Sequence, residues 1–311
     1  MKLPLLHRMA WLTAVAVLTT MPGASPAAAL GASPWQKVGS DAHSGVSGIA
    51  YEGRTDDGTG VRVLVVHDNK RTGQPRLSRI THEEGAVGVS PVTWDGPEPS
   101  DLEAIEAIPG MPGEYLALAS RGIVYRLKVT DSTATVVDHS PLPAIGEGDD
   151  FESLALFSHD GRLAALWADR GAGAERPATL YAAPLTFAAW GQPLFGAVTR
   201  RAYRAAYPTD AATRHLSDIS LTGSGRIIAG SASDAGDNGP FDSAVSDAGR
   251  VTVSADGGVQ VALAPFPTVL GTFPQYKVEG VECLPGSADA VLGTDDENRG
   301  GYVRDVPLCG V

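Results

Sequence analysis

Five short segments of the chain repeat one pattern, and this repetition constrains the fold more than any other feature of the sequence. In each segment an apolar residue is followed by Ser or Glu, then by a small or acidic residue, and then by an aliphatic residue. The segments are residues 46–49 (VSGI), 102–105 (LEAI), 151–154 (FESL), 216–219 (LSDI) and 278–281 (VEGV). Such internal periodicity is typical of folds that use one supersecondary unit several times around a common core.

The sequence after each repeat reads as further short strands. A turn and a second run rich in Val, Ile, Leu and Ala follow every segment, and most units show a third run. The 37 Gly and 22 Pro residues separate these runs, as expected of a chain of many short strands. Four-stranded units of this length are typical of a propeller. We therefore predict an all-β fold, a five-bladed β-propeller whose inner strands start near residues 47, 103, 152, 217 and 279.

The two ends of the predicted domain bear on how the ring closes. Only 32 residues follow Glu279, which is enough for three strands but tight for four. Residues 35–39 (WQKVG) can supply the missing outer strand of the last blade, which removes a free edge. We predict one domain over residues 34–311. A β-sandwich or two smaller β domains are the alternatives, and residues 186–215 are the stretch most suited to a short helix.

The first 29 residues have the features of a secretory signal peptide. Lys2 and Arg8 belong to a short basic start, an apolar run covers residues 9–20, and small residues around Ala27 and Ala29 suit a cleavage site. The apolar run is too short to span a bilayer. We therefore expect a secreted, extracellular protein, and a retained anchor is the alternative.

The chain has two cysteines, Cys283 and Cys309, and both fall in the last predicted blade. An even pair in an exported chain indicates a disulfide bond, with two free thiols as the alternative. We therefore predict a bond between these two residues.

The charge of the chain limits its partners. The formal net charge is −12, and loss of Lys2 and Arg8 with the signal peptide would leave 22 basic residues against 36 acidic ones. A surface this acidic repels nucleic-acid phosphates and anionic lipid heads. We therefore expect no nucleic-acid partner and no membrane association after signal cleavage. The same surface favours cations.

The residues at the matched position of the five repeats predict a metal site. They are Ser47, Glu103, Glu152, Ser217 and Glu279. In a propeller the starts of the inner strands converge on one axis, where three carboxylates would repel one another unless a cation lay between them. Oxygen ligands in this number suit Ca²⁺ better than Mg²⁺ or Zn²⁺. In the alternative, the glutamates accept hydrogen bonds from backbone amides and hold no metal.

The order Ser, Glu, Glu, Ser, Glu at these positions resembles the calcium-activated nucleotidase (apyrase) family. The segments SDLEAI, DFESLAL, LSDISL and YKVEGVECL are similar to the inner-strand motifs of that family. His67-Asp68 followed by Thr72-Gly73 is similar to a motif of its first blade. The resemblance implies a five-bladed propeller with a central Ca²⁺ that hydrolyses nucleoside di- and triphosphates. A looser resemblance is to secreted phytase-like or esterase-like propellers.

The loops between the second and third strands of each predicted blade open on the face where the first strand begins, so they surround the predicted metal. Arg clamps beside Ca²⁺ can hold a phosphate, and a nearby carboxylate can activate water. The candidate substrate-binding residues are Lys70, Arg71, Arg121, Arg170 and Arg299. The candidate catalytic residues are Asp68 first, then Asp169 and Asp295. In the alternative, these residues are ordinary turn residues and local ion pairs.

These features together favour a secreted Ca²⁺-dependent phosphohydrolase that acts on a nucleotide or another phosphoester. Its substrate would be a small anionic or phosphorylated molecule. One alternative is a non-catalytic, metal-stabilised propeller that binds a ligand or a protein partner. Another is a Ca²⁺-dependent esterase or lactonase.

Overall fold

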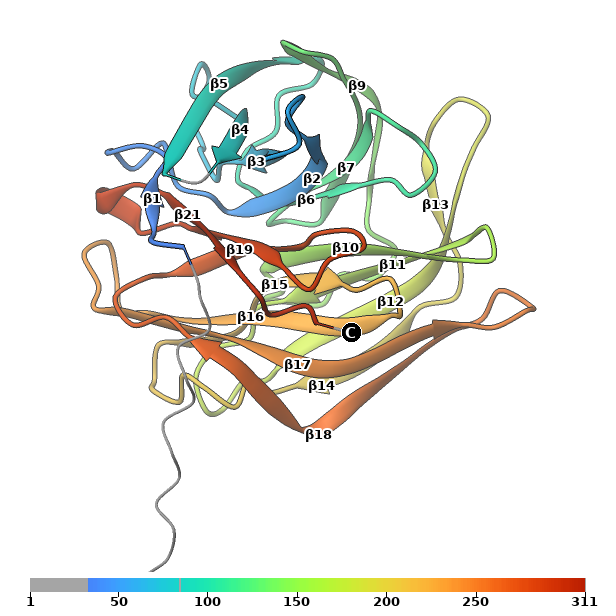
Figure 1. Cartoon of the computed structure of the whole chain (residues 1–311). Coiled ribbons are helices and arrows are strands. Elements are labelled where there is room, and N and C mark those ends of the chain that lie inside the picture. Colours follow the sequence, from blue (N-terminus) through green and yellow to red (C-terminus); the bar gives the residue numbers. More distant parts are fainter. Residues whose placement is uncertain (1–32, 84, 311) are drawn as a thin grey trace, which may run out of the picture. The chain divides into compact units, whose positions relative to one another are not determined.

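The computed structural model describes residues 33–83 and 85–310, and over these residues the protein is built from β-strands with no α-helix (Figure 1). One short 3₁₀ turn, η1 (Glu297–Arg299), is the only helical element in this part of the chain. No described helix is long and apolar enough to cross a membrane. The all-β prediction is therefore confirmed. The predicted signal peptide, residues 1–29, lies outside the described residues.

The largest sheet has the strand order β2-β3-β4-β5-β9-β8-β7-β6 and consists of two antiparallel meanders. Parallel pairing of β5 with β9 joins them. The first meander is β2 (Gly48–Arg54), β3 (Val61–Val66), β4 (Leu77–Glu83) and β5 (Ala86–Asp95). The second is β6 (Leu102–Ala107), β7 (Glu114–Ala119), β8 (Ile123–Val129) and β9 (Thr133–Pro141).

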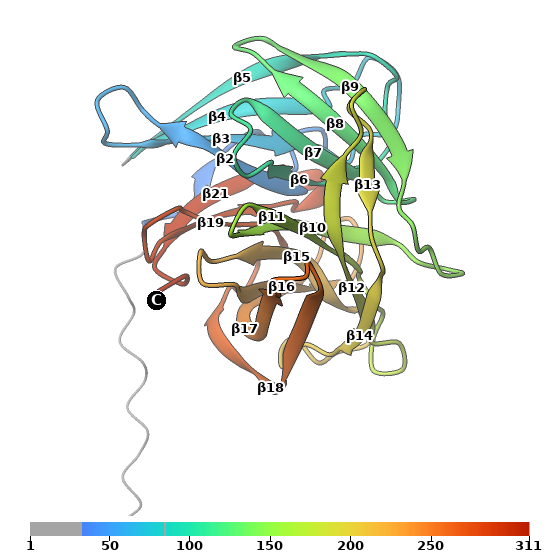
Figure 2. The same ribbon diagram turned by 90° about the vertical axis from the view of Figure 1, so that its right-hand side faces the viewer.

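Three further antiparallel sheets follow the same plan. One contains β10 (Phe151–His159), β11 (Arg162–Asp169), β12 (Ala178–Phe187), β13 (Pro193–Phe195) and β14 (Thr199–Tyr203). Strands β13 and β14 both pair with β12 (Figure 2), so the helix expected in residues 186–215 is wrong. The next sheet contains β15 (Thr213–Leu221), β16 (Arg226–Asp234), β17 (Phe241–Val253) and β18 (Val259–Thr272).

The last sheet combines strands from both ends of the described chain. Its order is β1 (Gln36–Lys37), β21 (Tyr302–Val306), β20 (Ala290–Thr294) and β19 (Val278–Cys283). A disulfide bond links Cys283, at the end of β19, to Cys309, with 5.7 Å between their Cα atoms. The predicted disulfide is therefore confirmed.

The five repeats lie at or near the starts of the first strands of five successive antiparallel units, β2, β6, β10, β15 and β19. Each unit has four strands except that of β10, which has five. These strands contact one another in the cyclic order β2, β6, β10, β15, β19 and back to β2. Apolar side chains fill the space between successive units; Leu166 of β11, for example, belongs to the same buried cluster as Ile219 and Ile227. Because such side chains alternate along the strands, one face of each unit packs against its neighbour.

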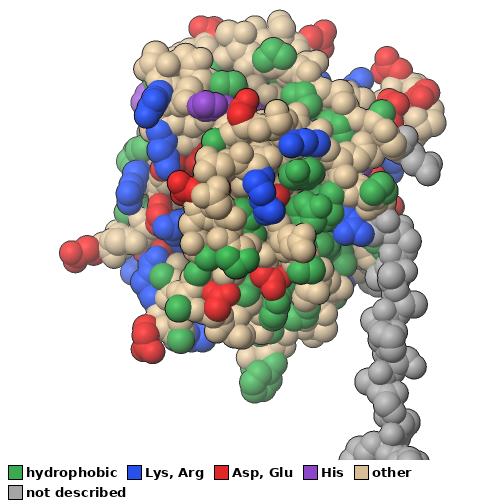
Figure 3. All heavy atoms as spheres, turned by 90° about the vertical axis from the view of Figure 1, so that its left-hand side faces the viewer, with side chains coloured by type: hydrophobic (Ala, Val, Ile, Leu, Met, Phe, Trp, Pro, Cys, Tyr) green, Lys and Arg blue, Asp and Glu red, His purple; other side chains and the backbone are tan. Residues whose placement is uncertain are grey.

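The surface carries both signs of charge in spite of the net charge of −12. On the face shown in Figure 3, Lys and Arg side chains are interspersed with Asp and Glu and with apolar side chains. Net charge alone therefore does not tell what a particular pocket will bind, and the site must be judged from its own residues.

Candidate active site

The glutamates of the second, third and fifth repeats are each the extra residue of a β-bulge. In β6 the pairing shifts between Leu102 and Ala104, so Glu103 has no partner residue on β7. The same shift skips Glu152 in β10 and Glu279 in β19. A bulge bends its strand and re-aims the side chain of the extra residue. Three equivalent bulges thus give three glutamates the same exceptional position on their strands.

These three glutamates line one pocket of about 370 Å³, here called the acidic pocket. Ten acidic and five basic side chains line it, so with all of them ionised its charge is strongly negative. The acidic residues are Asp68, Asp101, Glu103, Asp150, Glu152, Asp234, Asp237, Glu279, Asp295 and Glu297. The basic residues are Lys70, Arg121, Arg170, Arg214 and Lys277.

Arg214 of β15 connects the carboxylates of the pocket. Its Nη1 lies 3.4 Å from Glu152 and 3.0 Å from Glu279, and its other terminal nitrogen donates to Asp234. Glu152 has a second cation, because Arg170 Nη1 donates to its Oε1 at 2.9 Å. Two guanidinium groups therefore contact Glu152.

Lys277 is a buried cation beside Glu279. Its Nζ lies 3.3 Å from Glu279 and also contacts Glu297, while its side chain is only 2% exposed. Burial alone would lower the pKa of Lys277, but Glu279 and Asp295 raise it above its ordinary value. The ammonium group is therefore charged, and Glu279 has compensating charges from both Lys277 and Arg214.

Glu103, unlike Glu152 and Glu279, lacks a cationic partner in the part of the chain described. Its carboxyl group has no hydrogen-bond or ion-pair partner in residues 33–83 and 85–310, although the side chain is 9% exposed and lines the pocket. Burial raises the pKa of Glu103 well above its usual range, and the neighbouring charge of Glu152 raises it further. These surroundings therefore favour the protonated form of Glu103.

Two of the predicted catalytic aspartates, Asp68 and Asp295, line the acidic pocket. Burial raises the pKa of Asp68, while the charges of Lys70 and Lys277 partly oppose this shift. Burial also raises the pKa of Asp295 to about 7. A Cβ atom on Gly45 would lie 2.3 Å from Asp295 Oδ1, so the position beside this carboxyl group has room only for glycine.

The third predicted catalytic aspartate and the two serines of the ring lie elsewhere. Asp169 is buried outside the acidic pocket and forms an ion pair with Arg176 at 2.9 Å. Ser217 donates a hydrogen bond to the carbonyl of Val278 at 2.8 Å. Ser47 is buried, and its Oγ has no hydrogen-bond partner among the described residues. The structure thus brings together the three glutamates of the ring but not its serines.

The predicted substrate-binding cations are also divided. Lys70, Arg121 and Arg170 line the acidic pocket, whereas Arg71 and Arg299 do not. Arg299 lies over the ring of Phe241, 5.0 Å from its centroid. Arg71 is exposed on the segment between β3 and β4. Three of the five cations are therefore in position to meet a ligand of this pocket.

Two basic side chains compete with the metal ion that was expected among the glutamates. No group of three or more His, Cys, Asp or Glu side chains in the described part of the chain is arranged to hold a metal ion. Arg214 and Lys277 lie within ion-pair distance of Glu152 and Glu279, and they supply the positive charge for which Ca²⁺ was invoked. Ca²⁺ stays a prediction.

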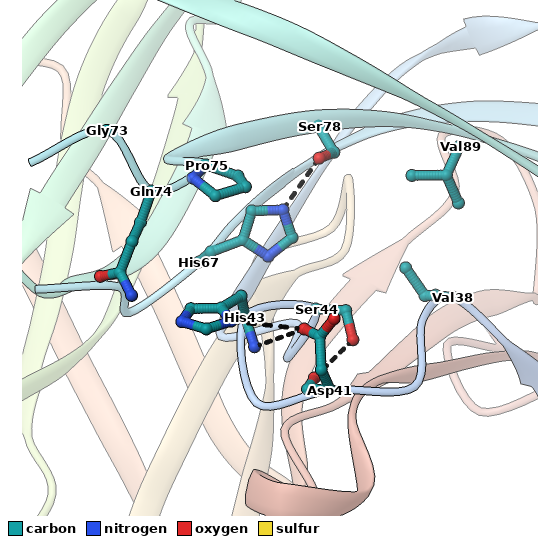
Figure 4. Close-up of a pocket in the computed structure, with 10 residues that line it drawn as sticks. All are labelled: Val38, Asp41, His43, Ser44, His67, Gly73, Gln74, Pro75, Ser78 and Val89. Atoms are coloured by element: carbon teal, nitrogen blue, oxygen red, sulfur yellow. Dashed lines mark hydrogen bonds and ion pairs between the residues drawn. The ribbon is translucent and has the colours of Figure 1, made fainter. Parts of the chain in front are cut away.

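A second pocket, of about 420 Å³, surrounds His67 at the end of β3 (Figure 4). The His67 ring lies between two oxygens, with Nδ1 2.6 Å from the Gly45 carbonyl and Nε2 2.9 Å from Ser78 Oγ. Burial lowers the pKa of His67, so the ring is neutral. Asp41 is the one acidic side chain among the described residues that line this pocket. This second pocket therefore lacks paired carboxyl groups, so the acidic pocket is the better candidate site.

Sequence reasoning missed Arg214 and Lys277, the two cations that set the charge of the site. Lys277 comes two residues before Glu279 and Arg214 three residues before Ser217. Asp101 and Asp150 likewise precede Glu103 and Glu152 by two residues and line the pocket. A search for charged residues just before each repeat would have found all four.

No protein-family model matches the chain, and no curated protein matches it. Among solved structures, the chain is similar to a GH43 endo-arabinanase from Bacillus licheniformis, with 11% identity, 86% of this chain and 96% of that chain covered, and a TM-score of 0.48. For an exo-1,5-α-L-arabinanase from a bovine ruminal metagenomic library the values are 12%, 84%, 92% and 0.48. For the GH43 protein BlXynB from Bacillus licheniformis they are 15%, 68%, 42% and 0.40, so the chain spans less than half the length of that protein.

Two of these structures are GH43 proteins and the third is an arabinanase; none is an apyrase-like nucleotidase or a phytase, so the predicted family resemblance and the Ca²⁺-dependent phosphohydrolase are wrong. The site gives a physical reason. Ten acidic side chains against five basic ones repel a phosphate, and Lys70 and Arg170 are already paired with carboxylates. The non-catalytic propeller and the Ca²⁺-dependent esterase or lactonase are not supported either.

Proposed function

We propose that the protein is a glycoside hydrolase whose chemistry takes place in the acidic pocket. Glycoside hydrolysis needs one carboxyl group that donates a proton to the leaving oxygen and a second, ionised carboxylate. The observation that carries the proposal is the contrast between Glu103 and Glu152. Glu103 has no cationic partner and a raised pKa, whereas the neighbouring Glu152 forms ion pairs with both Arg170 and Arg214.

In this proposal Glu103 is the general acid. It gives its proton to the glycosidic oxygen as the bond from that oxygen to the anomeric carbon breaks. The fixed charge of Glu152 keeps the proton on Glu103 until that step, because Glu152 is the neighbouring charge that raises the pKa of Glu103 most. The same negative charge stabilises the positive charge that develops on the sugar ring.

Asp68 is the proposed general base. It lines the same pocket, and burial raises its pKa toward the range in which a carboxylate is an effective base. Asp68 would take a proton from the attacking water, whose oxygen forms the new bond to the anomeric carbon. Glu103 and Asp68 belong to neighbouring units, so the site depends on the packing of β2–β5 against β6–β9.

The test is hydrolysis of aryl glycosides, with α- and β-anomers of common pentoses and hexoses, by wild type, Glu103→Gln and Asp68→Asn. We expect each variant to lose about 10²–10⁴-fold in kcat on nitrophenyl glycosides. On dinitrophenyl glycosides, whose leaving group needs no proton, Glu103→Gln should recover most of the loss and Asp68→Asn none.

Glu106→Gln is the matched control, because Glu106 lies on the same strand, β6, but outside the acidic pocket. It should hydrolyse both series within about threefold of wild type. Absence of glycoside hydrolysis by wild type over the whole panel would overturn the proposal. Normal activity of Glu103→Gln on nitrophenyl glycosides would overturn the assignment of the acid.

We also propose that the five antiparallel units are the blades of a five-bladed propeller, closed by the pairing of β1 with β21. The cyclic contacts of the five first strands support this arrangement. Export of the chain to an oxidising compartment is proposed as well. The basic and apolar character of residues 1–29 and the bond between Cys283 and Cys309 support it.

A further inference from the structure

Arg121 differs from the other four cations of the acidic pocket in its partners. Each of the others lies within 4.0 Å of at least one carboxylate. Arg121 has no carboxylate within that distance in the part of the chain that the structure describes, and its side chain is exposed. It is thus the pocket cation whose charge is available to a ligand.

The backbone that carries Arg121 is held firmly in place. Arg121 lies in the tight turn between β7 and β8, where the Gly122 N–H donates to the Ala119 carbonyl at 2.8 Å. Ser120 donates through its N–H to the Asp101 carbonyl at 2.9 Å and through its Oγ to Asp101 Oδ2 at 2.7 Å. Because Asp101 is two residues from Glu103, these bonds connect the backbone of the turn that carries Arg121 to the strand of the proposed acid.

The chemistry of a guanidinium group limits what Arg121 can select. It presents two parallel N–H donors that match a planar carboxylate, and such charge-assisted pairs are stronger than neutral hydrogen bonds. The acidic lining of the pocket would repel an anion everywhere else. A ligand with one carboxylate, placed to meet Arg121, therefore fits better than a ligand with several negative charges.

We propose that Arg121 binds the carboxylate of an acidic sugar, which makes glycosides of uronic acids the substrate class of this site. The inference rests on the proposed glycoside hydrolase activity. Arg121 acts here as a specificity residue: it holds the uronate while Glu103 and Asp68 carry out the hydrolysis. A neutral sugar of the same ring would lack this contact.

The experiment compares matched pairs of nitrophenyl glycosides that differ only in the carboxylate, glucuronide against glucoside and galacturonide against galactoside. Wild type should prefer a uronide. Arg121→Gln should raise KM for that uronide about tenfold or more, as loss of a charged hydrogen bond predicts, with kcat within threefold. Arg71→Gln is the control, since Arg71 is exposed but lies outside the acidic pocket. It should leave both constants unchanged.

The outcomes separate this inference from the proposed function. Efficient hydrolysis of a neutral glycoside with no preference for its uronide, or no effect of Arg121→Gln on KM for the uronide, overturns the role of Arg121 and leaves the hydrolase standing. Absence of turnover on every glycoside overturns the hydrolase. In that case binding of free glucuronate and galacturonate, measured by calorimetry, decides on Arg121: binding by wild type that Arg121→Gln loses supports the contact, and no binding by wild type overturns it.

Discussion

Strands β6 and β19 each carry two glutamates three residues apart, and the members of each pair have different surroundings. Glu103 and Glu279 line the acidic pocket together with five cations. Glu106 and Glu282 line a separate cavity of about 570 Å³, whose described lining contains no Lys, Arg or His. On each of these strands, one glutamate thus lines a pocket that contains cations, and the other lines a cavity without them in its described lining.

The difference shows in how each carboxyl group is stabilised. Glu282 accepts a hydrogen bond from the Tyr51 N–H at 2.8 Å and another from Ser220, but burial still raises its pKa to about 7. Burial and the charge of Glu282 raise the pKa of Glu106 well above its usual range. Without cations this cavity favours the protonated form of its glutamates. In the acidic pocket, by contrast, Arg214 and Lys277 lie within ion-pair distance of Glu152 and Glu279, and their charges oppose the effect of burial on the pKa of Glu279.

The largest expected effect comes from removing the cation that joins the carboxylates. Arg214→Met would leave Glu152 and Glu279 buried beside fewer positive charges, and we expect a loss of about 3–5 kcal/mol in the free energy of unfolding. The rate of glycoside hydrolysis should fall as well. Urea denaturation measures the loss in the free energy of unfolding. Arg62→Met is the control, because its partner Asp56 is almost fully exposed, and it should cost less than about 1 kcal/mol. Equal stability of wild type and Arg214→Met would contradict the idea that cations stabilise the glutamates of the acidic pocket.

Smaller effects on stability are expected from Glu→Gln substitutions at two positions of β19, Glu282 and Glu279. The two effects should have opposite signs. Glu282→Gln removes a carboxyl group whose pKa is higher in the folded protein than in the unfolded chain. The wild-type contribution of this group to stability is full below about pH 4.5 and is lost as the pH rises through 7. The variant should therefore gain relative to wild type between pH 5 and pH 8, by about 3 kcal/mol at most.

Burial raises the pKa of Glu279, and the charges of Lys277 and Arg214 oppose that shift. Glu279→Gln should instead lower stability at pH 7, because these two buried cations then keep only a neutral amide in place of the carboxyl group. Urea denaturation of wild type and both variants at several pH values between 5 and 8 measures the two effects. If both substitutions shifted stability in the same direction at pH 8, the two surroundings would not differ in the way proposed.

The smallest effect is expected at a carboxylate that lies in neither pocket. Asp169 accepts hydrogen bonds from the N–H groups of Asp150 and Gly171, both at 3.1 Å, and pairs with Arg176. Asp169→Asn keeps one oxygen acceptor and should cost about 1–2 kcal/mol, measured by thermal unfolding. Its kcat and KM should stay within about threefold of wild type. A loss of activity as large as that of Asp68→Asn would place Asp169 in the chemistry.

Much of the fold could be predicted because each unit repeats the same local signals. Four of the five first strands start within their repeats, β15 starts three residues before its repeat, and Cys283 and Cys309 form the expected bond. Residues 186–215 were harder to interpret. Their Ala and Arg content is compatible with a helix, but pairing with β12 provides backbone hydrogen bonds along β13 and β14 and overrides that local preference.

The candidate site was predictable only in part, because a repeat shows which residues are equivalent in sequence but not where a side chain points. Glu103, Glu152 and Glu279 share a pocket since each is the extra residue of a bulge. Ser47 precedes its strand and Ser217 lies within a longer irregularity of β15, so neither shares that geometry. Lys277 could have been found next to Glu279 in the sequence, but the position of Arg214 beside Glu152 and Glu279 depends on contacts between units, which no single repeat contains.

The pairing of β1 with β21 has a consequence for the order of events when the protein is made. Gln36 and Val303 are partners in one sheet although they are 267 positions apart. A ribosome must therefore finish nearly the whole chain before this sheet can form, and the closing contact is one of the least local in the molecule. Contacts of such long range form slowly, because a large loop has to close first. Closure of this sheet is thereby confined to the end of synthesis, after the other sheets have had time to form.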